Sequence, residues 1–373
     1  MVQNIGRCEW ASAKRLRVTA RDPGPGLAPH QGSTMPDVSS SDDVGKRLTR
    51  FLESQSKGET FTVTSVSPLS GGYSRTTHRA DVQWRDRGTQ HLLLRADPAE
   101  SSVFESNRDD EWDLLMALNK VSEISIPEPL WYDQDGKYFD SKCMVIQFHD
   151  GTSLKSEIEC GYDLDQATIL FADIAAAIHC IPLDALPKTM PRPTDWNSYL
   201  DSVIEIFDRT EHNIVENVPA VRYVHAWLRH HRPEPVPLTL VHGDLQPTNL
   251  LLTPNKPPLL IDWEFGRIGD PREDLGYFFQ FPMPPNLIRR NPELLLARYR
   301  EVTGLTKVQV NVETIQYFLM IGMARLLEQI LTAVDSLDQS GEGGAITTYL
   351  INAISYQCNE YLNIVRNSAV GVK

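Results

Sequence analysis

The sequence has few of the features that mark membrane, disulfide-rich or zinc-binding proteins. No stretch approaches the roughly 18 apolar residues of a membrane span, and the N-terminus lacks the apolar core of a secretory signal. The five cysteines are scattered, odd in number and without a C-x-x-C pair, so neither a disulfide framework nor a zinc site is indicated. We therefore expect a soluble protein of the reducing cytoplasm, with no membrane partner.

Positive charge is also in short supply. The chain has 36 lysines and arginines against 49 aspartates and glutamates, which gives a formal net charge of −13. This balance argues against a nucleic-acid binder and is compatible with a cationic ligand. At 373 residues, the chain is long enough for two or three domains or lobes.

The first 34 residues lack apolar periodicity, and the run Pro23-Gly24-Pro25-Gly26 interrupts any helix. We expect residues 1–42 to form a disordered leader. Met35, which precedes a polar run and a helix-like start, is a candidate initiator. N-terminal sequencing of native protein that begins upstream of Met35 would contradict this hypothesis.

The most informative stretch of the chain is residues 239–281. It places His242 and Asp244 shortly before Asn249, and then Asp262 and Glu264. A carboxylate, an amide and a second carboxylate at these spacings are typical of magnesium-assisted phosphoryl transfer, as in the catalytic loop and the D-F-G aspartate of protein kinases. For any one of these residues, a loop residue that caps a turn is the simpler alternative.

Two apolar runs, 250–252 and 259–261, flank residues 253–256, which have strong turn chemistry. They predict a hairpin that returns Asp262 to the neighbourhood of Asn249. The amide and the second carboxylate would then lie at the same end of the hairpin.

The region before residue 150 has the alternation of a five-stranded antiparallel sheet. A turn at Gly71 and Gly72 joins the first two strands, and its backbone N–H groups are candidates for approach to ATP phosphates, although an ordinary hairpin is the simpler interpretation. The predicted strands are 61–69, 73–84, 91–95, 131–133 and 143–148.

Arg95 ends the third strand, where kinases place a phosphate-binding lysine. A helix over 108–120 follows, and Glu111 shares its buried stripe with three leucines. A carboxylate on an apolar face needs a cationic partner, and Arg95 is the leading candidate. The alternatives are that Arg95 reaches solvent, that Glu111 only belongs to the acidic first turn, or that Glu105 is the partner.

The chain changes from strands to helices at about residue 150, which predicts an N-lobe at 43–149 and a C-lobe at 150–373. In a kinase-like arrangement, the backbone of Gln147 and His149 would meet adenine. A helix around Leu170 and Ile174 is apolar nearly all round, and His179 at its end is interpreted as a packed or capping histidine.

The motifs His242-Gly-Asp-Leu-Gln-Pro-Thr-Asn249 and Ile261-Asp-Trp-Glu264 resemble those of the aminoglycoside phosphotransferase and choline kinase-like family. The resemblance covers roughly residues 45–370. It implies an α+β, bilobal protein kinase-like fold with a small N-lobe (five-stranded sheet plus helix) and a larger, mainly helical C-lobe.

The resemblance also implies roles for individual residues. Asp244 is the implied catalytic aspartate, Asn249 and Asp262 the magnesium ligands, and Glu111 the partner of the phosphate-binding residue. Supporting positions are Asp274, which braces the catalytic loop, His242, and Glu264 beside metal or substrate. Arginine replaces the family's lysine at position 95, as in branches that resemble the kinase portions of acyl-CoA dehydrogenase-linked proteins.

These observations predict an ATP- and Mg²⁺-dependent kinase that phosphorylates a hydroxyl of a small molecule. Hydroxyacyl and macrolide-type acceptors remain open alternatives. A nucleotide-binding pseudokinase with a regulatory role is a second hypothesis, and Arg95 is its main support. A metallohydrolase with His242 and Asp244 as ligands is a weaker third, because no second cluster of ligands falls at suitable spacing.

Overall fold

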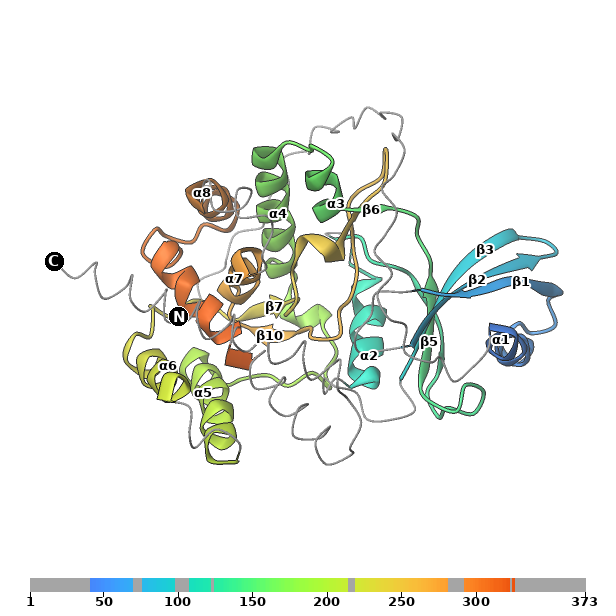
Figure 1. Ribbon diagram of the computed structural model, residues 1–373, viewed down its shortest axis with the longest axis horizontal. Coiled ribbons are helices and arrows are strands. Elements are labelled where there is room, and N and C mark those ends of the chain that lie inside the picture. The colour runs from blue at the N-terminus through green and yellow to red at the C-terminus, as the bar shows by residue number, and fades with distance from the viewer. Residues whose placement is uncertain are drawn as a thin grey trace.

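The computed structural model describes residues 41–69, 76–97, 107–121, 124–213, 219–280, 292–322 and 324–325. It shows the predicted α+β, bilobal arrangement: a five-stranded antiparallel sheet at one end, a mainly helical part at the other, and a helix, α2, between them (Figure 1). We call these two parts the N-lobe and the C-lobe. None of the helices in the described ranges has both the length and the apolarity needed to cross a membrane.

The sheet has the strand order β1-β2-β3-β5-β4, and every neighbouring pair is antiparallel. Successive side chains of a strand point to opposite faces. On β3, Leu92 and Leu94 are therefore buried in the core under α1, whereas Leu93 and Arg95 belong to the opposite face. The bounds are β1 Phe61–Pro68, β2 Thr76–Trp84, β3 Gly88–Ala96, β4 Pro129–Asp133 and β5 Cys143–Gln147.

Two helices cover the two faces of the sheet. Helix α1 (Ser41–Gln55) buries Val44, Leu48, Phe51 and Leu52 against the outer face. Helix α2 (Arg108–Leu118) begins at Asn107, whose side chain accepts a hydrogen bond from the backbone of Asp109. Its buried leucines belong to the same hydrophobic core as the C-lobe, so α2 is packed against both lobes.

The core of the C-lobe is built around α4, which packs along α8. Its alanines, Phe171 and Ile178 are buried, as the nearly uniform apolarity of this helix predicts. The elements are β6 Thr152–Ser153, α3 Leu154–Glu159, α4 Leu164–His179, η1 Leu183–Ala185, α5 Trp196–Asn213, α6 Pro219–His230, β7 Thr239–Val241, η2 Pro247–Asn249, β8 Leu250–Leu252, β9 Leu259–Leu260, β10 Arg267–Gly269, α7 Arg272–Gln280 and α8 Pro292–Thr303, and a further helical segment covers 312–322.

Several sequence predictions fall outside the described residues. These are residues 1–40 of the predicted leader, Gly71 and Gly72, and Glu105. Where the structure can be compared, the element boundaries agree to within a few residues. The largest difference is β3, which begins at Gly88 instead of residue 91 because it pairs along its whole length with β2.

Candidate active site

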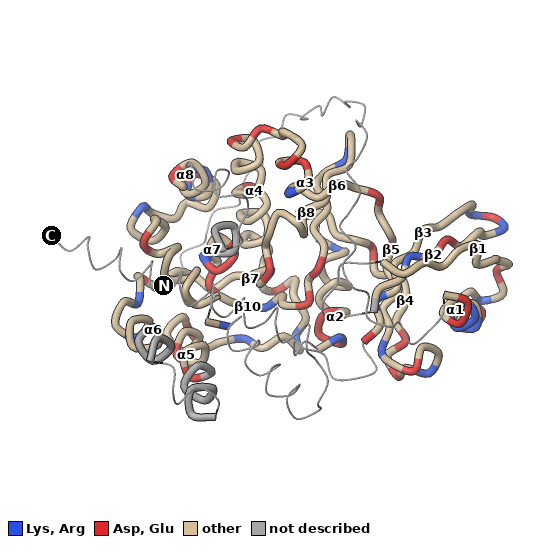
Figure 2. Tube along the Cα trace, in the orientation of Figure 1, with Lys and Arg blue, Asp and Glu red and all other residues tan. Residues whose placement is uncertain are grey.

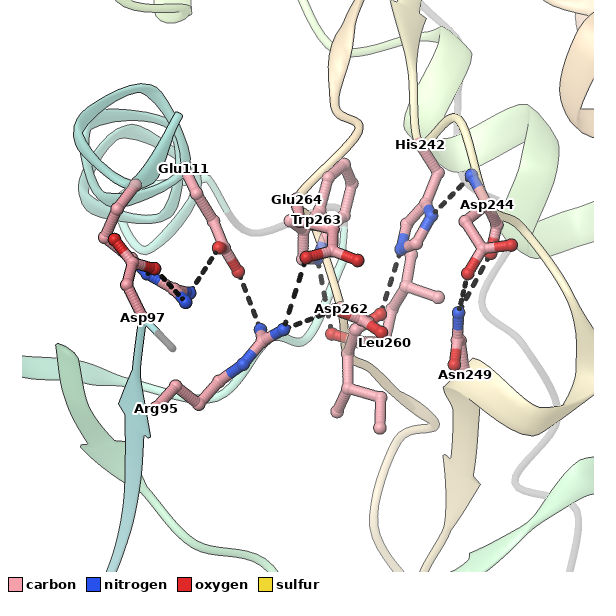
Figure 3. A network of polar contacts seen from close by, with 12 residues as sticks. Arg95, Asp97, Glu111, His242, Asp244, Asn249, Leu260, Asp262, Trp263 and Glu264 are labelled. Atoms are coloured by element: carbon pink, nitrogen blue, oxygen red, sulfur yellow. Dashed lines mark hydrogen bonds and ion pairs between the residues drawn. The ribbon is translucent and has the colours of Figure 1, made fainter. Parts of the chain in front are cut away.

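The residues of the predicted catalytic loop lie between β7 and β8, on the side of the C-lobe that faces α2 (Figure 3). Asp244 accepts hydrogen bonds from the Gln246 side chain at 3.0 Å to each carboxylate oxygen, and from Asn249 Nδ2 at 2.8 Å. Asn249 Nδ2 also donates to the backbone carbonyl of Asp244 at 3.0 Å. The carboxylate of Asp244 is therefore held in one orientation by two amides.

The side chain of His242 is fully buried and packs beneath the backbone of this loop. Its Nε2 lies 3.0 Å from the Ile261 carbonyl, and its Nδ1 accepts from the backbone N–H of Asp244 at 3.3 Å. The ring packs against Trp263, with 4.6 Å between centroids. Burial lowers the pKa of His242. The imidazole thus connects the loop to the backbone at Ile261, and its supporting role in catalysis stays a prediction.

The loop is braced by Asp274, which lies in the first turn of α7. Its two carboxylate oxygens accept from the backbone N–H groups of His242 and Gly243 at 2.8 and 2.9 Å, and His179 Nε2 lies 3.1 Å away. Burial would raise the pKa of Asp274, but the bond to His179 and the neighbouring charges and backbone donor outweigh this and lower it. His179, which also contacts Tyr299, is the packed histidine that the sequence predicts.

Gly243 is required by the shape of the loop. Its φ is +80°, and an added Cβ would lie 2.4 Å from both the Arg267 guanidinium and the Phe265 carbonyl. Any side chain at this position would clash with Arg267 and Phe265 and would shift the backbone next to Asp244.

The predicted hairpin is present as β8 and β9, and it brings the second carboxylate back to the loop. Leu250 pairs with Leu260, and the Ile261 N–H donates to the Asn249 carbonyl at 2.9 Å. Asp262 follows with φ +67°, a left-handed conformation that is uncommon outside glycine and that aspartate tolerates better than most residues. Asp262 and Asn249 therefore lie at the same end of the hairpin, as expected.

Arg95 joins the N-lobe to this site. Its Nη1 donates to Glu111 Oε1 at 2.7 Å and its Nη2 to Asp262 Oδ1 at 2.6 Å, while Glu264 Oε2 lies 4.0 Å from Nη2 (Figure 3). Burial would lower the pKa of Arg95, but these three carboxylates outweigh it and raise that pKa. The predicted Arg95–Glu111 ion pair is confirmed, and the contact with Asp262 connects residues 167 positions apart.

The sequence did not reveal two further members of this network. Arg108, at the start of α2, donates from Nη1 to Glu111 Oε2 at 2.8 Å and from Nη2 to Asp97 Oδ1 at 2.9 Å. Asp97 follows Arg95 by two residues and Arg108 precedes Glu111 by three, which are the spacings of one strand face and one helix face. These two spacings were the features of the sequence that could have indicated Asp97 and Arg108 as members of the network.

The site has an excess of negative charge. Burial and the charge of Asp262 raise the pKa of Asp244 to about 7, against the opposing effect of the two amide donors. Acidic positions gather where α2 faces the segments around β8 and β10 (Figure 2). An unbalanced group of carboxylates of this kind favours a bound cation.

The donor atoms fit magnesium better than a transition metal. Asn249 and Asp262 offer hard oxygen ligands, which Mg²⁺ prefers, and Mg²⁺ is commonly held by one or two carboxylates together with substrate phosphates. Across the described residues, no group of three His, Cys, Asp or Glu side chains is placed to bind a metal by itself. A cation here would need ligands from a substrate as well.

The segment between the lobes begins at Gln147 and His149. The Gln147 N–H donates to the Glu128 carbonyl at 2.8 Å, and its side-chain amide donates to the His91 carbonyl at 2.9 Å. His149 is partly buried, and this burial lowers its pKa. Gln147 is therefore anchored by two hydrogen bonds, and the contact of Gln147 and His149 with a base stays a prediction.

The sequence profile of the phosphotransferase enzyme family matches residues 65–305, which is more than half of the chain and includes all of these polar residues. The chain belongs to this family. Among similar proteins is acyl-CoA dehydrogenase family member 11 of Gallus gallus, which is 25% identical over 288 residues. That match covers 70% of this chain but only 36% of the chicken protein.

Solved structures share the fold at low sequence identity. A putative aminoglycoside phosphotransferase from Ralstonia eutropha JMP134 has a TM-score of 0.63 and 16% identity, over 86% of this chain and 98% of that protein. A thermostable mutant of aminoglycoside phosphotransferase APH(4)-Ia, in a ternary complex with ADP and hygromycin B, has a TM-score of 0.62 and 15% identity, over 87% of this chain and 98% of that one. These likenesses confirm the kinase-like fold of this phosphotransferase.

Proposed function

We propose that this phosphotransferase moves the γ-phosphoryl group of Mg·ATP to a hydroxyl group of a small molecule. The observation that supports this most directly is the joint placement of Asp244, Asn249 and Asp262 at one end of the β8–β9 hairpin, with Arg95 reaching them from the N-lobe. A catalytic-loop aspartate, an amide, a second carboxylate and a phosphate-binding cation are the parts that phosphoryl transfer requires.

Each residue has a role that follows from its contacts. Asn249 and Asp262 would hold the magnesium, which supplies charge neutralisation between the phosphates. Arg95 would direct its Nη2 toward a phosphate, since this nitrogen already faces Asp262. Asp244 would orient the acceptor hydroxyl and accept its proton, because its carboxylate is fixed by two amides and is only partly buried, which leaves it open to an acceptor. Catalysis would then depend mainly on positioning and charge stabilisation.

The nucleotide would lie between the lobes, whose boundary we place at residues 149 and 150. Its base would meet the backbone at Gln147 and His149, and the turn at Gly71 and Gly72 would approach the phosphates. The complex of APH(4)-Ia with ADP and hygromycin B supports this class of ligand, because that protein shares the fold. For the acceptor, the similarity to acyl-CoA dehydrogenase family member 11 keeps hydroxyacyl compounds beside amino sugars as candidates.

The substitution Asp244→Asn tests the catalytic assignment. We expect loss of phosphoryl transfer, by about 10²-fold or more, because the proton acceptor is removed. Binding of Mg·ATP, measured by calorimetry, should remain, because the metal ligands Asn249 and Asp262 are unchanged. Asp135→Asn is the matched control, since Asp135 is exposed in the turn between β4 and β5. Near-normal turnover in the Asp244 variant would refute the assignment.

The acceptor can be found by screening hydroxyl-bearing metabolites and antibiotics for ATP consumption, followed by mass detection of an added phosphate. If the wild-type chain binds Mg·ATP tightly but neither phosphorylates any tested compound nor hydrolyses ATP, the result would favour the pseudokinase alternative. ATP consumption that requires magnesium would favour the kinase.

A further inference from the structure

Arg108 is a buried cation placed behind the residues that would bind the nucleotide. Its side chain has no solvent exposure, and it lies between Asp97 of the segment after β3 and Glu111 of α2. Glu111 is thereby shared by two guanidinium groups: Oε1 accepts from Arg95 at 2.7 Å and Oε2 from Arg108 at 2.8 Å.

We propose that Arg108 is a positioning residue that prevents Arg95 from pairing with both oxygens of Glu111, and so keeps Arg95 Nη2 directed at the nucleotide phosphates. This inference rests on the proposed function, because it assigns Arg108 a purpose in nucleotide binding.

The physical reason is the geometry of arginine. A guanidinium next to a carboxylate prefers two parallel hydrogen bonds, one to each oxygen. Arg95 makes only one such bond to Glu111, since Arg108 occupies the other oxygen, and its second nitrogen reaches Asp262 at 2.6 Å. Without Arg108, both nitrogens of Arg95 would turn to Glu111 and away from the site. A lysine at position 95 has a single terminal nitrogen and cannot form such a paired contact, so its orientation would not depend on Arg108.

Asp97 completes the arrangement by fixing Arg108 itself. Its Oδ1 accepts from Nε at 3.1 Å and from Nη2 at 2.9 Å, which leaves Nη1 for Glu111. The two arginines and the two acidic residues balance in charge. Arg95 therefore does not depend on Asp262 for neutralisation, and its Nη2 can pass from Asp262 to a phosphate when that carboxylate binds a cation.

The test is a double-mutant cycle on the full chain, with the affinity for Mg·ADP measured by calorimetry. Arg108→Met should weaken binding by about tenfold, the lower end of what loss of an orienting partner costs. In an Arg95→Lys background, the same change should alter affinity by less than about twofold. Arg108→Lys should restore most of the wild-type affinity, because an ammonium can still occupy Glu111 Oε2.

A role in stability alone would lower the unfolding midpoint without this dependence on residue 95. Equal losses of affinity in both backgrounds, or none in either, would overturn the inference. Arg47→Met is the control, since Arg47 pairs with Asp43 and Asp140 elsewhere in the N-lobe. If Arg108→Met does not fold, Asp97→Asn replaces it in the cycle, with a loss in the same direction. A wild-type chain that does not bind Mg·ADP would overturn the proposed function, and this inference with it.

Discussion

At the scale of single residues, Asp244 shows how the site balances charge. The carboxylate receives three hydrogen bonds from neutral amides, but these do not offset burial beside Asp262 and Glu264. Its pKa of about 7 means that Asp244 binds a proton at lower pH, which reduces the repulsion between neighbouring carboxylates.

This shift predicts how stability depends on pH in the presence of a chelator. The folded-state pKa of Asp244 lies above its ordinary value of 3.8, so the folded state binds the proton more tightly than the unfolded state. The resulting stabilisation is fully present below pH 3.8 and is lost as the pH rises toward 7. Relative to Asp244→Asn, the wild type should lose at most about 4 kcal/mol of unfolding free energy over that interval.

Chemical denaturation of both proteins at several pH values measures this difference. A wild type that gains stability over the variant as the pH rises would contradict the assigned environment of Asp244. Added Mg²⁺ with nucleotide should remove most of the effect, because a bound cation would neutralise the neighbouring carboxylates in place of the proton on Asp244.

The residues of the site were predictable from the sequence to different degrees. Spacing along one helix placed Glu111 on the buried stripe and made Arg95 its partner, which the structure confirms. The same reasoning did not find Arg108, because a helix begins with exposed residues more often than with a fully buried arginine. Its burial depends on Asp97, and no local pattern shows that the two residues meet.

At the scale of elements, the catalytic loop is held by the start of α7. Asp274 accepts from two consecutive backbone N–H groups and contacts the buried His179, so one carboxylate connects three segments of the C-lobe. The sequence indicated the segment, by resemblance, and the hairpin, by its apolar runs. It did not indicate β6, β7 or β10, because these two- and three-residue strands have few alternating positions and, unlike β8 and β9, are not joined to their partners by a short turn.

Asp274→Asn tests this brace. An asparagine is neutral and keeps only one accepting oxygen, so both buried backbone N–H groups lose a charged partner and at least one loses its acceptor. We expect a loss of about 2–4 kcal/mol in unfolding free energy and a fall in kcat that exceeds any change in KM for ATP, because the loop and not the nucleotide is displaced. Denaturation and steady-state kinetics measure the two effects.

The matched control is Asp173→Asn, which removes a partly exposed ion pair with Arg298 in the same lobe. That change should cost less than about 1 kcal/mol. Comparable effects of the two substitutions would show that Asp274 has no special role in the loop.

At the scale of the whole molecule, the lobes are joined around the site by three kinds of contact. Arg95 binds Asp262, the backbone at Ser125 accepts from Leu260, and Leu114 of α2 packs so closely over Gly266 that a Cβ there would lie 2.3 Å from it. One of these three contacts, between Arg95 and Asp262, is made by residues that would bind Mg·ATP, so a ligand at that position should stabilise the whole fold.

We expect Mg·ATP at about 100 times its Kd to stabilise the protein by about 2.7 kcal/mol, which is a shift of a few degrees in the thermal midpoint. ATP with a chelator should give a smaller shift, and Asp262→Asn should abolish the difference between the two conditions. Differential scanning fluorimetry makes the comparison. Equal shifts with and without magnesium in the wild type would contradict the assignment of Asn249 and Asp262 as its ligands.

The β8–β9 hairpin has a consequence for how this chain can evolve. Its paired residues, Leu250 with Leu260 and Leu251 with Leu259, fix the approach of Asn249 to Asp262 at one end, while residues 254–257 at the other end are exposed. Insertions and deletions in that turn leave the pairing register unchanged. Related genes are therefore expected to differ in length at this point while the number of residues from His242 to Asn249 stays constant.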